Sequence, residues 1–139
     1  MAGTGSMSAS NISPSPTSRR MTGKVAVVTG STQGLGEMIA RQFVAEGATG
    51  IVLTGRNRAR GEKVKSALER AGTKVVFVEA DLAQVDSAKK IMAATDESFG
   101  RIDTLVNSAA ITDRGTILDT TPEFFDQMMA INLTLCCNH

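Results

Sequence analysis

Residues 29–36 read Thr29-Gly30-Ser31-Thr32-Gln33-Gly34-Leu35-Gly36 and directly follow the apolar run Val25-Ala26-Val27-Val28. An apolar segment with helical periodicity comes after Gly36, so the order is strand, glycine turn and helix. In such a unit Gly30 allows a tight turn, Gly34 lets the backbone approach a pyrophosphate, and Gly36 lets the helix pack on the strand. The phosphates then lie at the helix N-terminus, where N–H groups and the helix dipole favour negative charge. The stretch therefore predicts dinucleotide binding, whereas isolated glycines would mark only a turn.

The composition is that of part of an ordinary α/β domain. The chain has 139 residues, of which 42% are hydrophobic and 21% charged, and this is enough to bury one core. A net charge of +1 gives no electrostatic footprint for nucleic acid, and no apolar stretch approaches the roughly 18 residues that span a bilayer. We therefore expect neither nucleic acid nor a membrane as a partner.

The two cysteines are adjacent, at Cys136 and Cys137, so they cannot form the framework of a disulfide-stapled secreted domain. A cytoplasmic location is the expectation that follows. The run from Cys136 to His139 also suggests zinc ligands, but its spacing matches no closed structural site and the chain has no other histidine. We therefore predict no metal site.

Residues 1–20 differ in composition from the rest of the chain. Eight of the first eighteen residues are Ser or Thr, and no acidic residue precedes Glu37. This predicts a disordered tail, residues 1–20, followed by one dinucleotide-binding domain, residues 21–139. The tail faintly resembles an organelle transit peptide, but without a basic amphipathic face a solvated tail is the favoured interpretation.

From Met21 onward, strands and helices alternate with short connections, which predicts an α/β fold with a Rossmann-like, doubly wound parallel sheet. We expect the sheet to be incomplete, ending after about four strands and the following helix. After the first strand, the apolar patterns and stop signals predict helix 34–46, strand 51–53, helix 64–72, strand 75–78, helix 85–100, strand 102–106 and a last helix from about Pro122.

Four motifs together resemble the classical short-chain dehydrogenase/reductase family. They are the glycine turn, Asp81-Leu82, Asn107-Ser108-Ala109-Ala110 and Ile131-Asn132-Leu133, in that order along the chain. The resemblance covers about residues 21–133, and the tetrad at 107–110 departs from the usual Asn-Asn-Ala-Gly at its second and fourth positions. The resemblance implies reversible hydride transfer between a nicotinamide and a carbonyl or secondary alcohol.

The motifs also imply roles for single residues. The glycine turn supplies five predicted cofactor-binding residues: Gly30, Ser31, Gly34, Leu35 and Gly36. By resemblance, Asp81 accepts a hydrogen bond from the adenine amino group, Leu82 packs near the adenine ring, and Asn107 orders the end of the fourth strand beside the ribose. From the residues alone, Asp81 could instead cap the following helix, and Asn107 could satisfy only backbone groups.

The end of the second strand bears on the choice of cofactor, and it reads Thr54-Gly55-Arg56. A carboxylate at this point would bind the ribose 2′-hydroxyl of NAD, but Gly55 occupies the position and Arg56 follows. Because the arginine fork suits phosphate, we predict NADP(H) in preference to NAD(H), with Arg56 as the main determinant and Arg58 as a helper. The alternative for both is a solvated loop arginine.

By resemblance, Asn132 matches a helical asparagine that supports a proton relay, although among apolar neighbours it could also be a satisfied interface group. The general acid in this family is a tyrosine, and the sequence contains none. Three hypotheses follow: the cofactor-binding N-terminal part of an NADP(H)-dependent oxidoreductase, which we rank first, a catalytically inactive NADP(H)-binding module, or an interaction fragment that acts on a full-length homologue. The apolar last helix, with Phe125 and Met129, predicts a homo-oligomer.

Overall fold

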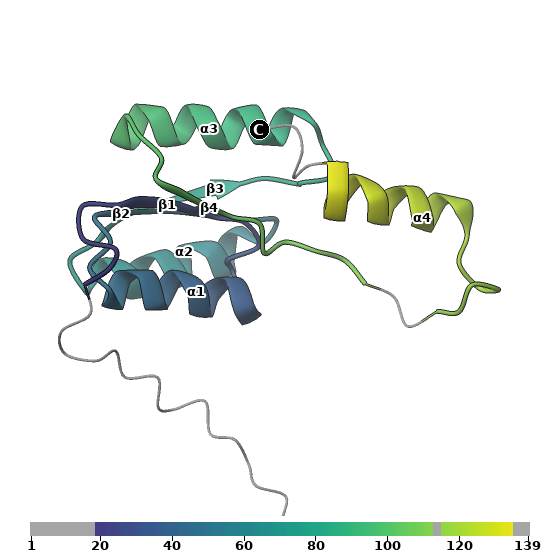
Figure 1. Ribbon diagram of the computed structural model, residues 1–139, viewed down its shortest axis with the longest axis horizontal. Helices are drawn as coiled ribbons and strands as arrows, with labels where there is room; N and C mark the ends of the chain where they lie inside the picture. The colour runs from purple at the N-terminus through teal and green to yellow at the C-terminus, as the bar shows by residue number, and fades with distance from the viewer. Residues whose placement is uncertain (1–18, 113–114, 135–139) are drawn as a thin grey trace, which may run out of the picture.

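The computed structural model describes residues 19–112 and 115–134 (Figure 1). The predicted tail, except Arg19 and Arg20, and the cysteine-histidine run lie outside the described residues. In chain order the elements are β1 (Val25–Val28), α1 (Gly34–Ala45), β2 (Gly50–Gly55), α2 (Arg58–Glu69), β3 (Lys74–Glu79), α3 (Asp86–Phe99), β4 (Thr104–Val106), α4 (Pro122–Met129) and the π-helical turn η1 (Ala130–Thr134).

The four strands form one parallel sheet in the order β3-β2-β1-β4, which confirms the predicted Rossmann-like arrangement. Helices α1 and α2 cover one face of the sheet and α3 covers the other, while α4 lies beyond the sheet (Figure 1). The chain moves outward from β1 through β2 to β3 and then returns to the other side of β1 to form β4. This change of direction places a crevice at the carboxyl ends of β1 and β4, where open α/β sheets bind their ligands.

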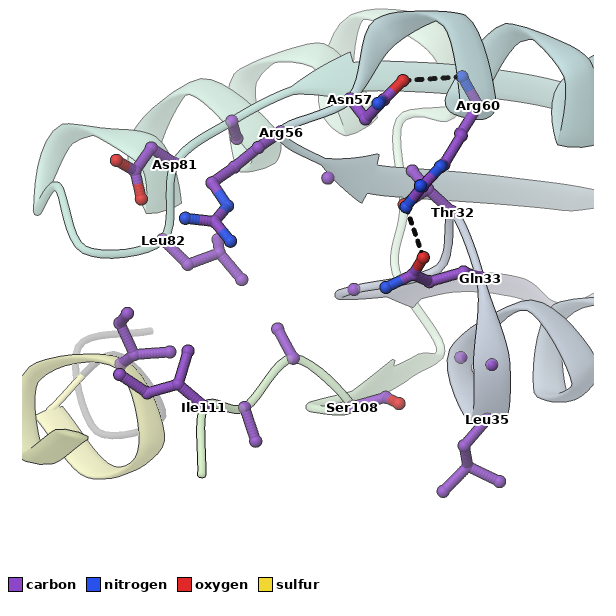
Figure 2. A pocket seen from close by; sticks show the side chains of 18 residues that line it. Thr32, Gln33, Leu35, Arg56, Asn57, Arg60, Asp81, Leu82, Ser108 and Ile111 are labelled. Atoms are coloured by element: carbon purple, nitrogen blue, oxygen red, sulfur yellow. Dashed lines mark hydrogen bonds between the residues drawn. The ribbon is translucent and has the colours of Figure 1, made fainter. Parts of the chain in front are cut away.

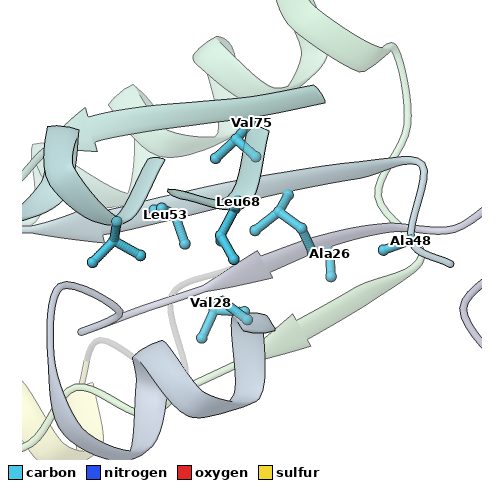
Figure 3. Packing of buried hydrophobic residues seen from close by; sticks show 9 residues of the cluster. Ala26, Val28, Ala48, Leu53, Leu68 and Val75 are labelled. Carbon is cyan, nitrogen blue, oxygen red and sulfur yellow. The ribbon is translucent and has the colours of Figure 1, made fainter. Parts of the chain in front are cut away.

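The core is divided by the sheet into two apolar clusters. Every residue of β1 is buried, as expected for a central parallel strand that is covered on both faces. Alternate residues point to opposite faces, so Ala26 and Val28 pack with Leu53 and Leu68 beneath α1 and α2 (Figure 3). The intervening Val27 belongs to the second cluster, beneath α3. This packing holds the carboxyl ends of the strands in fixed register.

The bounds of β2 and β4 differ from the predicted ones, because backbone pairing with the neighbouring strand sets them and apolar content does not. β2 extends beyond the predicted 51–53 because it pairs with β3 over six residues, from Gly50 opposite Lys74 to Gly55 opposite Glu79. β4 is shorter than the predicted 102–106 because its pairing with β1 begins only at Thr104.

Helix α2 begins earlier than its apolar residues indicate. Its first residue is Arg58, because Asn57 caps the helix by accepting a hydrogen bond from the Arg60 N–H at 2.9 Å. The first turn, Arg58 to Gly61, has no large apolar residue to reveal it in the sequence. It brings Arg60 to the same end of the sheet as the glycine turn.

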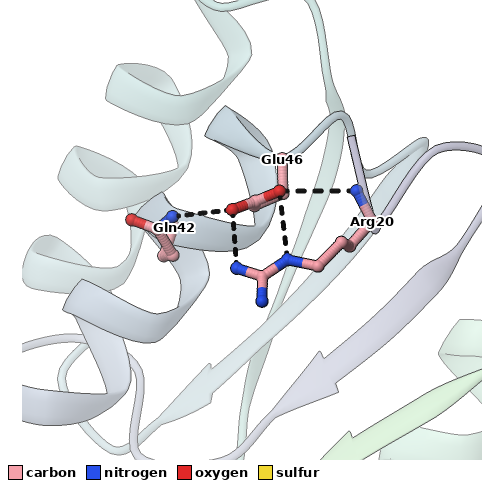
Figure 4. Close-up of polar contacts among 3 residues, drawn as sticks. All are labelled: Arg20, Gln42 and Glu46. Carbon is pink, nitrogen blue, oxygen red and sulfur yellow. Dashed lines mark hydrogen bonds and ion pairs between the residues drawn. The ribbon is translucent and has the colours of Figure 1, made fainter. Parts of the chain in front are cut away.

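Glu46, at the end of α1, is an acidic residue that is buried. Its carboxylate accepts hydrogen bonds from Arg20 Nη2 at 2.9 Å and from Gln42 Nε2 at 3.1 Å (Figure 4). The same carboxylate raises the pKa of Arg20 above its ordinary value, chiefly through this hydrogen bond. Arg20, which we assigned to the tail, is thus tied to α1 just before the chain enters β1.

Candidate cofactor-binding site

A cleft of about 480 Å³ opens at the carboxyl ends of the strands (Figure 2). Four segments that are far apart in the sequence line it. They are the glycine turn (Gly30 and residues 32–36), the end of β2 with the start of α2 (residues 55–57 and Arg60), the turn after β3 (residues 80–82), and the segment after β4 (residues 108–111), with Ile131 beside them. The sequence motifs therefore converge on one site.

Gly30 is required by a close approach of two segments. Its φ is +62°, and a Cβ built on it would lie 2.7 Å from the Cα of Ala109. Only glycine fits this conformation without moving the segment after β4. Gly36 is also tightly packed, because its Cβ would lie 2.5 Å from the Gly30 carbonyl oxygen. The turn, the helix and the segment after β4 are therefore in direct contact.

The N-terminus of α1 faces the cleft. Gln33 is the N-cap residue, and its side chain makes no capping hydrogen bond to the first-turn N–H groups of this helix. Gly34 lines the cleft, and a Cβ there would meet nothing within 4 Å, so the space beside it is open. Leu35 also lines the cleft, with 71% of its surface exposed. The arrangement can accept an anionic group at the helix N-terminus.

Ser31 lies in the glycine turn but does not line the cleft. It is fully buried, its Oγ donates to the Val28 carbonyl at 2.7 Å, and the Thr54 N–H donates to the same Oγ at 3.0 Å. Its side chain therefore joins β1 to β2. The motif alone could not distinguish this supporting position from a direct contact.

The segment after β4 is held by Thr29, a residue to which we had given no role. Thr29 Oγ1 accepts hydrogen bonds from the Ser108 N–H at 3.1 Å and the Ala109 N–H at 3.2 Å. The same hydroxyl lies 3.4 Å from the Val106 carbonyl, to which it can donate. Asn107, which we expected to order this segment, is exposed and is not among the residues that line the cleft.

Three arginines follow β2, and two of them line the cleft. Arg56 projects over the cleft toward Asp81 and Leu82, and Arg60 donates from Nη1 to Gln33 Oε1 (Figure 2). Arg58, the predicted helper, instead lies 3.9 Å from Glu79 in an exposed ion pair outside the cleft. Arg60 was not among the residues predicted from the sequence. Its signal was Asn57, because this N-cap fixes where α2 starts and hence which arginine turns toward the glycine motif.

Asp81 and Leu82 both line the cleft after β3. Asp81 Oδ1 accepts from the Ala83 N–H at 3.0 Å, and its carbonyl accepts from Ser87 Oγ at 2.6 Å. The alternative in which Asp81 caps α3 is wrong, because the N-cap residue of that helix is Val85 and no side chain caps it. The short turn that Asp81 closes leaves the buried Leu82 against the cleft.

Asn132 lies in the turn after α4 and reaches the far end of the cleft through Ile111. Its Nδ2 donates to the Ile111 carbonyl and its Oδ1 accepts from the Ile111 N–H. Ile111 and Ile131 line the cleft, whereas Asn132 is not among the lining residues. The side chain is therefore a hydrogen-bonded support for the segment after β4.

The described residues contain neither a metal-binding cluster nor a membrane-spanning helix. Within residues 19–112 and 115–134, no group of three or more His, Cys, Asp or Glu side chains is placed to hold a metal ion. In the same ranges, every helix is too short or too polar to cross a bilayer.

Several known proteins are similar to this chain in sequence. An NADP-dependent (R)-specific alcohol dehydrogenase from Lentilactobacillus kefiri is 41% identical over 115 residues, which are 82% of this chain and 44% of that protein. Versicolorin reductase 1 from Aspergillus parasiticus is 35% identical over 113 residues, 81% of this chain and 43% of that protein. The chain thus spans about half the length of the curated relatives it matches.

Solved structures agree with these sequence matches. L-Sorbose reductase from Gluconobacter frateurii, in complex with NADPH and L-sorbose, has a TM-score of 0.82 and 32% identity, covering 87% of this chain and 46% of that one. A metagenomic short-chain oxidoreductase in complex with NADP has a TM-score of 0.78 and 31% identity, covering 85% of this chain and 53% of that one. The family model described as short chain dehydrogenase matches residues 24–138. With the glycine turn, the parallel sheet and the cleft in place, this chain belongs to the short-chain dehydrogenase/reductase family of oxidoreductases.

Proposed function

We propose that this chain binds NADP(H) in preference to NAD(H), as the cofactor-binding part of an oxidoreductase that acts on a carbonyl or secondary alcohol. The supporting observation is the end of β2, where Gly55 stands at the position of the ribose-binding carboxylate and Arg56 lines the cleft beside it. Among the described residues that line the cleft, Asp81 is the only carboxylate, and it lies at the turn after β3. A 2′-phosphate near Gly55 would therefore meet positive charge.

The residues fit the remaining parts of this cofactor. The N-terminus of α1 and the open space beside Gly34 accept the pyrophosphate, because uncapped N–H groups and the helix dipole face the cleft there. Asp81 and Leu82 provide a carboxylate and an apolar surface for the adenine. When bound, the nicotinamide supplies the hydride acceptor or donor of the reaction, and this chain's residues bind and orient it.

The relatives support the same choice of cofactor. The Lentilactobacillus kefiri enzyme is named as NADP-dependent, and the two solved structures carry NADPH and NADP. Their substrates differ, as the names alcohol dehydrogenase and L-sorbose reductase indicate. The similarity to these proteins supports NADP(H) as the cofactor and a carbonyl or an alcohol as the substrate class. It does not select one substrate.

We propose that Asn132 positions the segment after β4 and thereby supports the proton relay that the family resemblance implies. Its two hydrogen bonds to Ile111 hold the backbone at the edge of the cleft. The sequence has no tyrosine to act as the general acid. This observation favours, as a second candidate, a chain that binds NADP(H) without transferring hydride by itself.

We propose that α4 and the turn η1 that follows it mediate a homo-oligomer. No residue of α4 is buried, and Phe125, Met129 and Leu133 expose 55%, 39% and 52% of their surfaces. Apolar residues one helical turn apart share a face, so they form a continuous surface for a second copy.

Titration of the 139-residue chain with NADPH and with NADH tests the cofactor proposal. We expect NADPH to bind at least about tenfold more tightly, since a charge-assisted contact is worth about 1.5–3 kcal/mol. Arg56→Ala should remove most of this preference, whereas Arg58→Ala, in the exposed pair with Glu79, should keep it. Equal affinities in the wild type, or an unchanged preference in Arg56→Ala, would overturn the proposal. Addition of NADPH with a panel of ketones then distinguishes hydride transfer from binding alone.

A further inference from the structure

We infer that Arg60, which lies outside every motif identified in the sequence, is a second determinant of NADP(H) preference and that Gln33 positions it. This inference rests on the proposed NADP(H) function, and it adds a residue pair that bridges α2 and the glycine turn. The bridge consists of the hydrogen bond from Arg60 Nη1 to Gln33 Oε1 (Figure 2). Both residues line the cleft, together with Gly55 and Arg56.

Arg60 is anchored at both of its ends. Its backbone N–H donates to Oδ1 of the capping Asn57 at 2.9 Å, which fixes the backbone of Arg60 in the first turn of α2. Its guanidinium is held by Gln33, so the long side chain reaches past Thr32 toward the glycine turn (Figure 2). An exposed arginine would ordinarily sample many rotamers. Anchoring at both ends keeps the positive charge at the cleft, beside Gln33.

The charge of Arg60 is not neutralised by this contact, because the acceptor is a neutral amide. Four other described arginines form ion pairs with carboxylates, namely Arg20 with Glu46, Arg41 with Glu37, Arg58 with Glu79 and Arg101 with Asp103. Within the described residues, Arg56 and Arg60 have no such pair, and neither do Arg19 and Arg70, which do not line the cleft. The two guanidinium groups that line the cleft are thus both without a carboxylate partner.

Two guanidinium groups that line one cleft without a carboxylate pair favour a group with more than one negative charge. A guanidinium has five N–H donors, so Arg60 can keep its bond to Gln33 while other N–H groups bind phosphate oxygens. A 2′-phosphate beside Gly55 would accept from Arg56 and from Arg60. A 2′-hydroxyl carries no charge and would gain little from either residue. Arg60 should therefore act on the preference between the two cofactors more than on the binding that they share.

Calorimetric titrations of the full chain with NADPH and NADH test this inference. The variants are Arg60→Ala, the polar but uncharged Arg60→Gln and the matched control Arg58→Ala. We expect both Arg60 variants to weaken NADPH binding by about tenfold or more, as for loss of a charge-assisted hydrogen bond, while NADH binding changes less than about twofold. Retained NADH binding also shows that each variant is folded. The control should match the wild type for both cofactors.

The role of Gln33 is tested by a double-mutant cycle. Gln33→Ala should weaken NADPH binding less than Arg60→Ala does, and the double variant should be no weaker than Arg60→Ala alone, because the amide acts through the arginine. Additive losses would show that Gln33 contacts the cofactor independently, which would overturn its positioning role.

The outcomes separate this inference from the proposed function. If the wild type prefers NADPH and Arg56→Ala abolishes the preference, while Arg60→Ala preserves it, only the inference fails. If Arg60→Ala weakens NADPH and NADH equally, Arg60 supports the shared part of the cofactor and the inference also fails. If the wild type does not discriminate between the cofactors, the proposed NADP(H) preference fails and this inference fails with it.

Discussion

Asn132 and Ile111 are joined by two hydrogen bonds, Nδ2 to the Ile111 carbonyl at 2.8 Å and the Ile111 N–H to Oδ1 at 2.9 Å. One side chain on the turn after α4 therefore satisfies both backbone groups of a residue that lines the cleft. The π-helical turn η1 carries this asparagine, and such turns often occur at functional sites.

Asn132→Ala should lower the free energy of unfolding by about 1–3 kcal/mol, because two part-buried backbone groups lose their partner. Urea unfolding measures this change. Gln127→Ala, at an exposed position of α4, is the control and should have an effect within about 0.5 kcal/mol. Equal effects of the two variants would show that the bonds to Ile111 contribute nothing to stability.

Gly30→Ala should destabilise the chain more than Gly100→Ala. Both glycines have φ near +65°, at +62° and +66°, so both variants place a side chain in a left-handed conformation that costs about 1–2 kcal/mol. Only at Gly30 would the new Cβ meet another segment, 2.7 Å from Ala109 Cα, which adds about 1–3 kcal/mol. Thermal or urea unfolding of both variants gives the comparison, and similar losses would contradict the close approach.

Gly55→Asp should reduce the preference for NADPH over NADH by about tenfold or more, because a carboxylate would repel a 2′-phosphate and pair with Arg56. The substitution also has a steric cost, since a Cβ at residue 55 would lie 2.5 Å from Thr32 Cγ2. Thr32→Ala in the same chain should restore stability while keeping the altered preference. Gly55→Ala is the control for the steric part, and if it changes the preference as much as Gly55→Asp does, the electrostatic explanation is wrong.

Asp103 should make stability depend on pH. Its pKa is held below the ordinary value by the hydrogen bond from Arg101 first and by the Val25 N–H next. Because the folded pKa is lowered, the stabilisation is present above the unfolded pKa, about 4, and is lost as pH falls through the folded pKa. The difference in free energy of unfolding between the wild type and Asp103→Asn should therefore shrink as the pH falls below about 4, the ordinary pKa of an aspartate.

Arg101→Ala is the control for the Asp103 measurement, because it removes the first cause of the lowered pKa. In that background the change with pH should be smaller. A difference between wild type and Asp103→Asn that stays constant over the same pH range would show that the folded and unfolded pKa values are equal.

Phe125→Asp should shift the chain toward the monomer if α4 mediates a homo-oligomer, because it places a charge on the exposed apolar face of the helix. Light scattering coupled to size-exclusion chromatography measures the mass. Gln127→Asp adds the same charge two residues further along, on a different side of α4, and should leave the mass unchanged. A wild-type chain that is monomeric at all concentrations would exclude this interface.

Local patterns in the sequence were sufficient to predict β1, α1 and the position of the cleft. The apolar run before Gly30 and the spacing of the glycines both depend on short-range geometry, which the sequence displays directly. The parallel sheet followed from the alternation of strand and helix. These features required no knowledge of which distant residues touch.

The features that the sequence did not predict depend on distant contacts. Position 50 suits a glycine because a Cβ there would lie 2.3 Å from the Phe99 ring, and Phe99 comes 49 residues later. Ser31 was assigned to the cofactor by its place in the motif, but its hydroxyl turns toward Val28 and Thr54. Arg60 was missed because its direction depends on Asn57 and Gln33 together.

The hydroxyl of Thr29 fastens the segment after β4 to the end of β1 through the N–H groups of Ser108 and Ala109. These two amides can exchange with deuterium only when that contact opens, so their protection reports on the attachment of one wall of the cleft to the central strand. A bound dinucleotide touching both walls would slow their exchange together. Deuterium exchange at these two amides would therefore report whether a dinucleotide occupies the cleft, without any catalytic turnover.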